Sequence, residues 1–147
     1  MKIWIPMDSA AKALGADEVA AAITAEAAAK GIDIQLIRNG TRGMIWLEPL
    51  VEVEIDGVRL ATMFNWITKA APLAIDGVRH GFGPVEPEDA VEILEGTSDK
   101  ALGPVDELDW MKRQTRLTFA RVGVIDPLSL EDYEAHGGLN GLRRATG

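Results

Sequence analysis

Side chains that commonly carry out chemistry are scarce in this chain. It has no cysteine and only two histidines, His80 and His136, which lie in different sequence contexts. Without a thiolate the chain cannot form a disulfide, exchange thiols, or hold a cysteine-ligated zinc ion or an all-cysteine iron–sulfur cluster. A histidine metal site would need both rings to meet carboxylates in space. We instead expect His80 to face solvent beside a strand, and His136 to lie near a helix C-terminus, where positive charge is favourable.

Carboxylates and hydroxyls offer no clearer catalytic set. Glu52 and Glu54 alternate with valines, so we interpret both as the solvated face of a strand rather than as an acid–base pair. Ser9 has no histidine near it in the sequence, and nothing supports a Ser–His–Asp arrangement around it. The sequence therefore predicts no catalytic residue, no cofactor-binding residue and no metal ligand in this chain.

Two glycine-containing segments could present backbone N–H groups to an anion. Asn39–Gly43 has the sequence NGTRG, in which Arg42 would add a positive charge, and Gly81–Gly83 has the sequence GFG. The first lacks the lysine of a phosphate-binding loop and the G-x-G-x-x-G spacing, and the second lacks a third glycine and precedes a proline. We expect a plain turn at Asn39–Gly43 rather than an anion site.

Composition places the chain among ordinary soluble domains. Its 147 residues are 47% hydrophobic and 26% charged, which suits one globular domain and excludes disordered and fibrous classes. The net charge of −8, without a run of basic residues, disfavours binding to nucleic acid or to an anionic membrane surface. No apolar stretch has the roughly 18–20 residues of a membrane span, and the N-terminus lacks the apolar region of a signal peptide. We therefore predict a cytoplasmic protein.

The elements that would position these side chains begin with alternating strand and helix. Residues 2–7 form a short apolar run typical of a buried strand, and residues 32–38 alternate as a second strand does. Between them, residues 17–30 are alanine-rich, with Asp17 as the expected N-cap and Gly31 suited to the left-handed position that ends a helix. This order predicts a βαβ unit.

The middle of the chain predicts a hairpin followed by helical turns. Residues 50–55 alternate strictly, Asp56-Gly57 accepts positive φ in a tight turn, and residues 58–60 lead back. Residues 63–71 are apolar and end before a proline, which predicts one or two helical turns.

A further helix is predicted after the middle of the chain. Pro87 suits the first position of a helix, Val91 and Leu94 supply an apolar face, and Gly96 suits the position that ends it. We expect a polar linker or loop over residues 96–104.

The C-terminal third turns basic over residues 110–121 and then predicts a short helix. Ser129, with an acid three residues later, resembles a capping box at the start of this helix. Taken together, the pattern predicts an α/β sandwich rich in strands, with an appended helical tail.

The C-terminal run Arg113–Leu142 closely resembles the opening of the NADH-binding flavoprotein subunits of complex I and their soluble relatives. Those subunits begin with a Gln-x-Arg strand, followed by G-x-I-D-P-x-S-x-x-x-Y and a Gly-Gly pair. One departure is Leu139, where many relatives have tyrosine. The matching residues here are Gln114, Arg116, Gly123, Ile125, Asp126, Pro127, Ser129, Tyr133, Gly137 and Gly138.

Upstream, the chain resembles the thioredoxin-like domain that precedes the flavoprotein in some of these subunits and that usually holds a [2Fe–2S] cluster. The second cysteine motif, G-C-x-G-x-C-x-x-x-P, keeps its frame in Gly40, Gly43 and Pro49, but Thr41 and Ile45 stand in the cysteine positions. The first cysteine pair is absent from residues 7–14, and residues 82–94 resemble the closing strand and helix of that domain. The resemblance therefore implies a thioredoxin-like sandwich whose cluster loop has lost its ligands.

This combination is similar to the beta subunit of soluble, molybdenum-containing, NAD-dependent formate dehydrogenases, with residues 61–77 as an insertion. It implies a cluster-less domain at residues 1–121 and the truncated start of the flavoprotein domain at residues 122–147. The FMN, NAD and [4Fe–4S] sites of such a subunit would lie beyond Gly147, so we expect no cofactor and no catalysis in this part alone. The implied partners are the rest of the beta subunit and the other dehydrogenase subunits, with a homodimer through the tail as a further expectation.

The function that this resemblance implies is assembly and docking within an oxidoreductase that converts formate and NAD⁺ to CO2 and NADH. We expect Arg42 and Trp46 to remain partly exposed and to dock the domain on its neighbours, as aromatic and arginine anchors often do. The alternative at this loop is that Met44, Ile45 and Trp46 fill the space of the lost cluster. The alternative for the whole chain is a free-standing, non-redox binding or regulatory protein with a thioredoxin-like fold.

Overall fold

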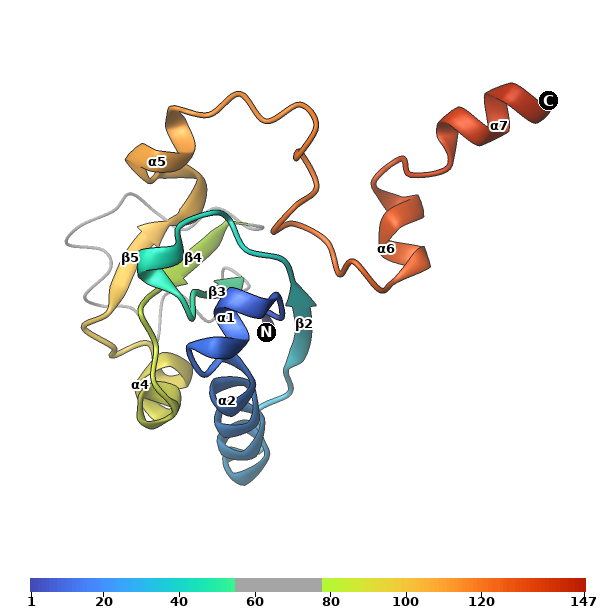
Figure 1. Cartoon of the computed structure of the whole chain (residues 1–147). Coiled ribbons are helices and arrows are strands. Elements are labelled where there is room, and N and C mark those ends of the chain that lie inside the picture. Colours follow the sequence, from blue (N-terminus) through green and yellow to red (C-terminus); the bar gives the residue numbers. More distant parts are fainter. Residues whose placement is uncertain (55–77) are drawn as a thin grey trace.

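A five-stranded mixed sheet lies at the centre of the computed structural model, which describes residues 1–54 and 78–147 (Figure 1). The strand order is β2-β1-β3-β4-β5, with β1 and β2 parallel and each other neighbouring pair antiparallel. The predicted α/β class is confirmed. The strands are β1 (Lys2–Pro6), β2 (Gln35–Asn39), β3 (Val51–Glu54), β4 (Arg79–Phe82) and β5 (Ala101–Pro104).

The predicted βαβ unit is confirmed at the start of the chain. Helix α2 (Ala16–Lys30) connects the parallel pair, and Gly31 ends it in the left-handed conformation with φ of 65°. The N-cap prediction is wrong, because the cap is Gly15 and the Asp17 carboxylate instead accepts a hydrogen bond from Arg38 at 2.6 Å. The segment before α2 holds a helix that the sequence did not predict, α1 (Ser9–Ala13), whose N–H groups are capped by the Asp8 side chain.

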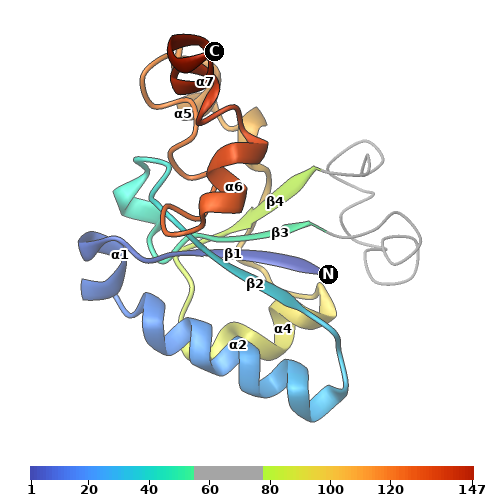
Figure 2. The same cartoon turned by 90° about the vertical axis from the view of Figure 1, so that its right-hand side faces the viewer.

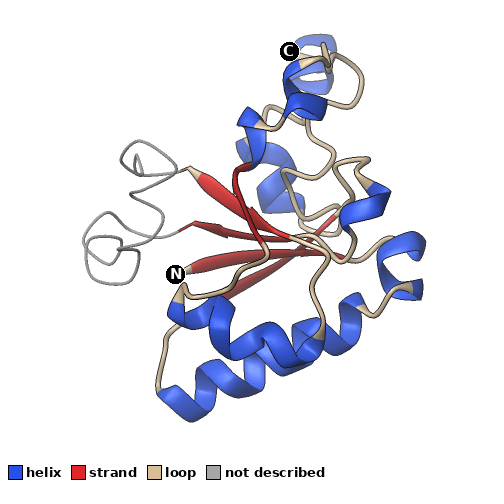
Figure 3. Ribbon diagram, turned by 90° about the vertical axis from the view of Figure 1, so that its left-hand side faces the viewer, coloured by secondary structure: helices blue, strands red, loops and turns tan. Residues whose placement is uncertain are grey.

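One face of the sheet is covered by α2 and α4 (Ala90–Glu95), which lie side by side beneath the strands (Figures 2 and 3). Alternate strand residues point to this face, which we call the helix face, and small alanines of α2 let the helix approach closely. Removal of these apolar side chains from water is the main way in which the helix layer stabilises the fold. The largest side chains in this core are Ile3, Ile5, Val19, Ile23, Val51, Val53, Phe82, Ile93 and Leu94.

The helix predicted near Pro87 begins and ends as expected. A 3-10 turn, η3 (Pro87–Asp89), leads into α4, and Gly96 follows with φ of 70°. Its apolar face differs from the prediction, because Val91 is exposed and Ala90, Ile93 and Leu94 are buried. The loop predicted over residues 96–104 is also wrong in its second half, since β5 pairs there with β4. This short edge strand contains a glycine and a proline, so it carries no alternation that the sequence could reveal.

The opposite face of the sheet is covered by irregular chain rather than by long helices (Figure 2). The cover comes from residues 40–50, which include the 3-10 turn η1 (Ile45–Leu47), and from residues 105–125, which include η4 (Val105–Glu107) and α5 (Asp109–Lys112). A second, smaller core fixes these two segments to each other. It consists of Met44, Leu50, Val105 and Met111.

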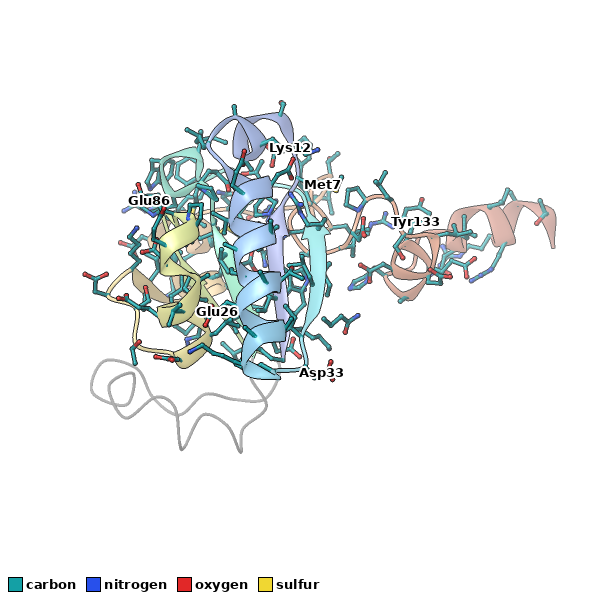
Figure 4. The ribbon with its side chains drawn as sticks, turned by 90° about the horizontal axis from the view of Figure 1, so that it is seen from below. Met7, Lys12, Glu26, Asp33, Glu86 and Tyr133 are labelled. Atoms are coloured by element: carbon teal, nitrogen blue, oxygen red, sulfur yellow. The ribbon has the colours of Figure 1, made fainter. Side chains whose placement is uncertain are left out.

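The tail after residue 126 extends away from the body as α6 (Leu130–Ala135) and α7 (Asn140–Thr146) (Figures 1 and 4). The predicted start of α6 is confirmed, because the Ser129 hydroxyl accepts a hydrogen bond from the N–H of Asp132 at 3.1 Å. Helix α7 was not predicted. Leu128, Leu130 and Leu142 are largely exposed along this tail.

Several predicted features lie outside the described residues. They are the hairpin turn at Asp56-Gly57, the returning segment 58–60, the helical turns at 63–71 and the insertion at 61–77. Among the helices that the structure describes, none is long and apolar enough to cross a membrane.

Candidate functional site

A buried carboxylate lies at the middle of the irregularly covered face. Glu52 projects from β3 to this face and is only 1% exposed, so its predicted place on a solvated face is wrong. Strand alternation shows which residues share a face, but it does not show what covers that face. Glu54 fits the prediction better: it is partly exposed and pairs with Lys2 at 3.3 Å.

Arg42 reaches Glu52 from the loop at residues 40–46. Its Nε and Nη2 donate to the two carboxylate oxygens at 2.8 Å each, the bidentate geometry in which guanidinium and carboxylate groups match best. Burial lowers the pKa of Arg42, but the hydrogen bonds and charge of Glu52 outweigh it, so the pKa is raised overall. The expectation that Arg42 is partly exposed is therefore wrong, because its buried guanidinium already has a carboxylate partner.

A second arginine shares the same carboxylate. Arg79 on β4 lies 3.6 Å from Glu52, and its guanidinium carbon lies 3.7 Å from the ring centre of Trp4. Burial lowers the pKa of Arg79, with Arg42 adding to the effect. Because guanidinium groups contact both oxygens of Glu52, this carboxylate links the loop at residues 40–46 and strand β4 to β3.

Glu52, Arg42 and Arg79 together form what we call the charged cluster. This cluster also holds residues 120–125, the segment that we call the strap. The carbonyl of Gly123 accepts hydrogen bonds from Asn39 at 2.7 Å and from Arg79 at 3.3 Å, and Arg79 also donates to Val124 at 3.0 Å. Gly123 has φ of 79°, and a Cβ there would lie 2.5 Å from Cδ of Arg42. Glycine is therefore required both by the backbone conformation and by the arginine packed against it. The strap thus packs closely on the body immediately after residue 121, the predicted domain border.

The loop with the substituted cysteine positions is held by its own polar contacts. The Thr41 hydroxyl donates to Glu48 at 2.6 Å and accepts from the N–H of Gly43 at 3.0 Å. Burial raises the pKa of Glu48. Gly40 packs against the strap, since a Cβ there would lie 3.6 Å from Val122. Thr41 thus stabilises the loop in the place where the resemblance puts a cluster ligand.

Two tryptophans stand on the outside of this loop. Trp46 is 59% exposed and meets Trp110 of α5 edge to face, with 5.2 Å between ring centres. Of the three residues that would fill a lost cluster's space, Met44 is buried, while Ile45 and Trp46 point outward. Exposed apolar side chains extend this patch, which we call the tryptophan surface: Ile45, Trp46, Trp110, Leu117, Phe119 and Val122.

An open pocket of about 550 Å³ lies within the tryptophan surface, between residues 41–43 and residues 110–122. Lys112, Arg113, Arg116 and Arg121 lie along this stretch, and no acid lies between residues 110 and 121. The stretch at residues 110–121 is thus apolar and basic in sequence, and in the structure Lys112 pairs with Glu107 at 2.6 Å and Arg121 lies over the Tyr133 ring. Leu117 and Phe119 were not predicted as functional; the signal that could have found them is the presence of large apolar side chains within the basic stretch.

The histidines lie far apart in the structure. His136 ends α6 as predicted, with Nδ1 2.8 Å from the Asp132 carbonyl oxygen. His80 is buried, so its predicted solvent exposure is wrong; β4 lies between β3 and β5, and neither ring nitrogen has a partner among the residues that the structure describes. Burial lowers the pKa of His80. Across residues 1–54 and 78–147, no group of three or more histidine, aspartate or glutamate side chains could hold a metal ion.

The remaining candidate residues have structural surroundings. Ser9 is the first residue of α1. Gly83 allows close approach, because a Cβ there would lie 2.5 Å from the carbonyl oxygen of Leu47, and a Cβ on Gly81 would lie 3.0 Å from Val105. These glycines permit packing of the covering segments onto β4 rather than access for an anion.

The tryptophan surface is therefore the part of the described chain best suited to recognition, and the charged cluster beneath it fixes its shape. No protein-family model matches the sequence. A search of curated proteins likewise finds no significant match.

Proposed function

We propose that this chain is the N-terminal docking domain of the beta subunit of a soluble, NAD-dependent formate dehydrogenase. In the whole complex, formate would be oxidised to CO2 and NAD⁺ reduced to NADH by other parts of the assembly, with FMN and iron–sulfur clusters carrying the electrons. The observation that carries the proposal is the tryptophan surface. It forms beside the loop in which Thr41 and Ile45 stand in the cysteine positions, and it offers three exposed aromatic rings to a partner, those of Trp46, Trp110 and Phe119.

The proposed fold is thioredoxin-like, and the order of elements supports it. A βαβ unit opens the chain, and residues 82–94, which resemble the closing strand and helix of such a domain, contain the end of β4 and most of α4. The loop at residues 40–46 follows β2 directly, so the substituted cysteine positions lie at the end of a strand beside the strap.

The tail supports the second half of the proposal. Residues 122–125 pack on the body, whereas Leu128, Leu130 and Leu142 are exposed in the tail that extends away from it (Figure 1). Exposed leucines in a helical segment suit the beginning of a further domain, whose core they would join. The proposed cytoplasmic location and the absence of a cofactor in this part follow from the same assignment.

A free-standing binding protein without a redox role is the alternative. It is favoured by one observation: residues 1–54 and 78–125 already bring together an apolar core on one face and a fastened strap on the other. A regulatory protein would use the same tryptophan surface for its own partner.

Co-expression with the remainder of such a beta subunit and its partner subunits tests the proposal. We expect the chain to co-purify with them, and Trp46→Ala to weaken the association at least tenfold, as loss of an interface anchor does. Leu14→Ala is the matched control, because Leu14 is comparably exposed but lies next to α1, outside the tryptophan surface. Absence of association, or equal loss in both variants, contradicts the proposal.

A further inference from the structure

Three guanidinium groups line a second pocket, between the charged cluster and the strap. The pocket has a volume of about 290 Å³ and is formed by Arg42, Arg79 and Arg116 together with Asp106, Met111, Ala120 and Val124. Its lining residues come from the loop after β2, from β4 and from residues 106–124, the segments on the side of the sheet opposite α2. Of its three arginines, Arg42 was considered from the sequence as part of an anion site at residues 39–43, whereas Arg79 was not considered and Arg116 only as a motif match.

The two carboxylates near this pocket, Glu52 and Asp106, do not balance its three guanidinium groups. Glu52 is the buried carboxylate, and it is shared between Arg42 at 2.8 Å and Arg79 at 3.6 Å. The other carboxylate, Asp106, has an 81% exposed side chain and lies 3.6 Å from Arg42, beyond a normal hydrogen bond. Water screens an exposed carboxylate strongly, so Asp106 compensates the cluster only weakly.

Arg116 supplies the unbalanced charge. Its guanidinium donates a hydrogen bond to the carbonyl of Val122 at 3.0 Å, and no carboxylate of residues 1–54 and 78–147 forms an ion pair with it. A guanidinium carries five N–H donors, so Arg116 keeps most of its donors for another acceptor. Burial lowers the pKa of Arg116, the neighbouring charge of Arg42 lowers it further, and the charges of Asp106 and Glu52 act in the opposite direction. An additional anion would reduce the repulsion between the guanidinium groups and accept hydrogen bonds from Arg116.

We propose that this pocket binds an oxyanion, a carboxylate or phosphate group, with Arg116 as its principal ligand and Arg42 and Arg79 as supporting charges. The planar fork of a guanidinium matches both groups, and pairs of this kind are stronger than neutral hydrogen bonds. Bound there, the anion would contact the strap through Ala120 and Val124, so it would stabilise the strap as well as the arginines. The site does not depend on the chain being part of a formate dehydrogenase.

Titration of the isotope-labelled chain with inorganic phosphate and, separately, with acetate tests the site. The amide resonances of Gly123 and Val124 report binding, and ionic strength is held constant with chloride. We expect saturable shifts with at least one of the two anions; shifts with phosphate alone indicate a phosphate ligand, and shifts with acetate alone indicate a carboxylate ligand. Absence of saturation with both anions overturns the proposal.

Three variants identify the residues responsible. Arg116→Gln should weaken binding at least tenfold, whereas Arg113→Gln, an exposed arginine of the same segment outside the pocket, should leave it unchanged. Asp106→Asn should tighten binding about fivefold, because it removes a negative charge that opposes the anion in a solvent-exposed setting. Equal weakening by Arg113→Gln overturns the proposal in favour of nonspecific attraction to basic chain, and weaker binding in Asp106→Asn contradicts the position of the anion beside Asp106.

Discussion

The two faces of the sheet are buried by different physical means. The helix face holds isoleucine, valine and alanine side chains beneath α2 and α4. The other face holds Glu52 between Arg42 and Arg79, beneath irregular chain. Apolar burial is tolerant of small adjustments, whereas a buried carboxylate is stable only while its partners keep their positions. The ion pairs of Glu52 with Arg42 and Arg79 therefore hold the segments that carry the tryptophan surface.

Glu52→Gln should have the largest effect on this comparison. The amide cannot balance two buried guanidinium groups, and removing one partner of a buried ion pair typically costs about 3–5 kcal/mol. Urea unfolding monitored by circular dichroism measures the loss. Glu54→Gln is the control, because its partly exposed pair with Lys2 should contribute less than about 1 kcal/mol. Equal effects of the two substitutions contradict a structural role for the cluster.

Gly123→Ala should follow, with a loss of about 2 kcal/mol. Alanine at φ of 79° is strained, and its Cβ would displace Arg42 from Glu52. Gly31→Ala separates the two causes, since Gly31 also has positive φ, of 65°, but no atom lies within 4 Å of its Cβ position. We expect the control to lose only about 1 kcal/mol, the strain alone. A smaller loss for Gly123→Ala than for Gly31→Ala contradicts the packing of the strap on Arg42.

The pH dependence of stability tests whether His80 is buried on the helix face. It pairs with Val53 and lies two residues from Phe82, so it shares the helix face with these apolar side chains. Burial lowers the pKa of His80, so below the ordinary value of about 6.5 the unfolded chain binds more protons than the native chain. Stability is then complete above this pH and falls as the pH decreases towards the folded pKa, by at most about 1.4 kcal/mol per pH unit.

Unfolding of His80→Gln and of the unsubstituted protein between pH 7.5 and 5 measures the effect. The decrease in stability should be shallower in His80→Gln, which lacks the buried imidazole. An identical pH profile for His80→Gln means that this histidine does not limit the stability of the helix face.

Trp46→Ala should have the smallest effect on stability. The side chain is mostly exposed, so the isolated protein should lose less than about 1 kcal/mol, chiefly the edge-to-face contact with Trp110. Thermal unfolding of the purified chain measures this change. A loss of 3 kcal/mol or more, as after truncation of a core aromatic, means that Trp46 stabilises the fold rather than an interface.

The sequence predicted the fold well where the residues that start, end or fill an element lie next to one another in the chain. The βαβ unit, the glycine that ends α2, the proline that opens η3 and the serine that caps α6 all depend on neighbouring residues. Helix α1 and strand β5 were missed because each is only a few residues long. The N-cap at Asp17 was wrong because Arg38, distant in sequence, binds its carboxylate.

The candidate site was predicted less completely, because its geometry depends on contacts between distant segments. The loop at residues 40–46 was identified from the sequence, and Trp46 is exposed as expected there. Arg42 was assigned to the surface because its bond to Glu52 forms only when the loop folds back over β3. The tryptophan surface also includes Trp110, Leu117 and Phe119, which lie more than 60 residues after Trp46 in the sequence. A local pattern can mark these apolar side chains, but it cannot show that the two segments meet.

The strap also has a consequence for the order of folding. Its bond from Asn39 to Gly123 closes a separation of 84 residues, and its bonds from Arg79 close separations of 44 and 45. The donors Asn39 and Arg79 lie on β2 and β4, and they come close together only when the sheet has formed. We therefore expect the strap to dock late in folding, after the entropy cost of pairing the strands has been met. Contacts made after the transition state slow unfolding without speeding folding. We therefore expect that loss of the strap's hydrogen bonds would speed unfolding of the body more than it would slow folding.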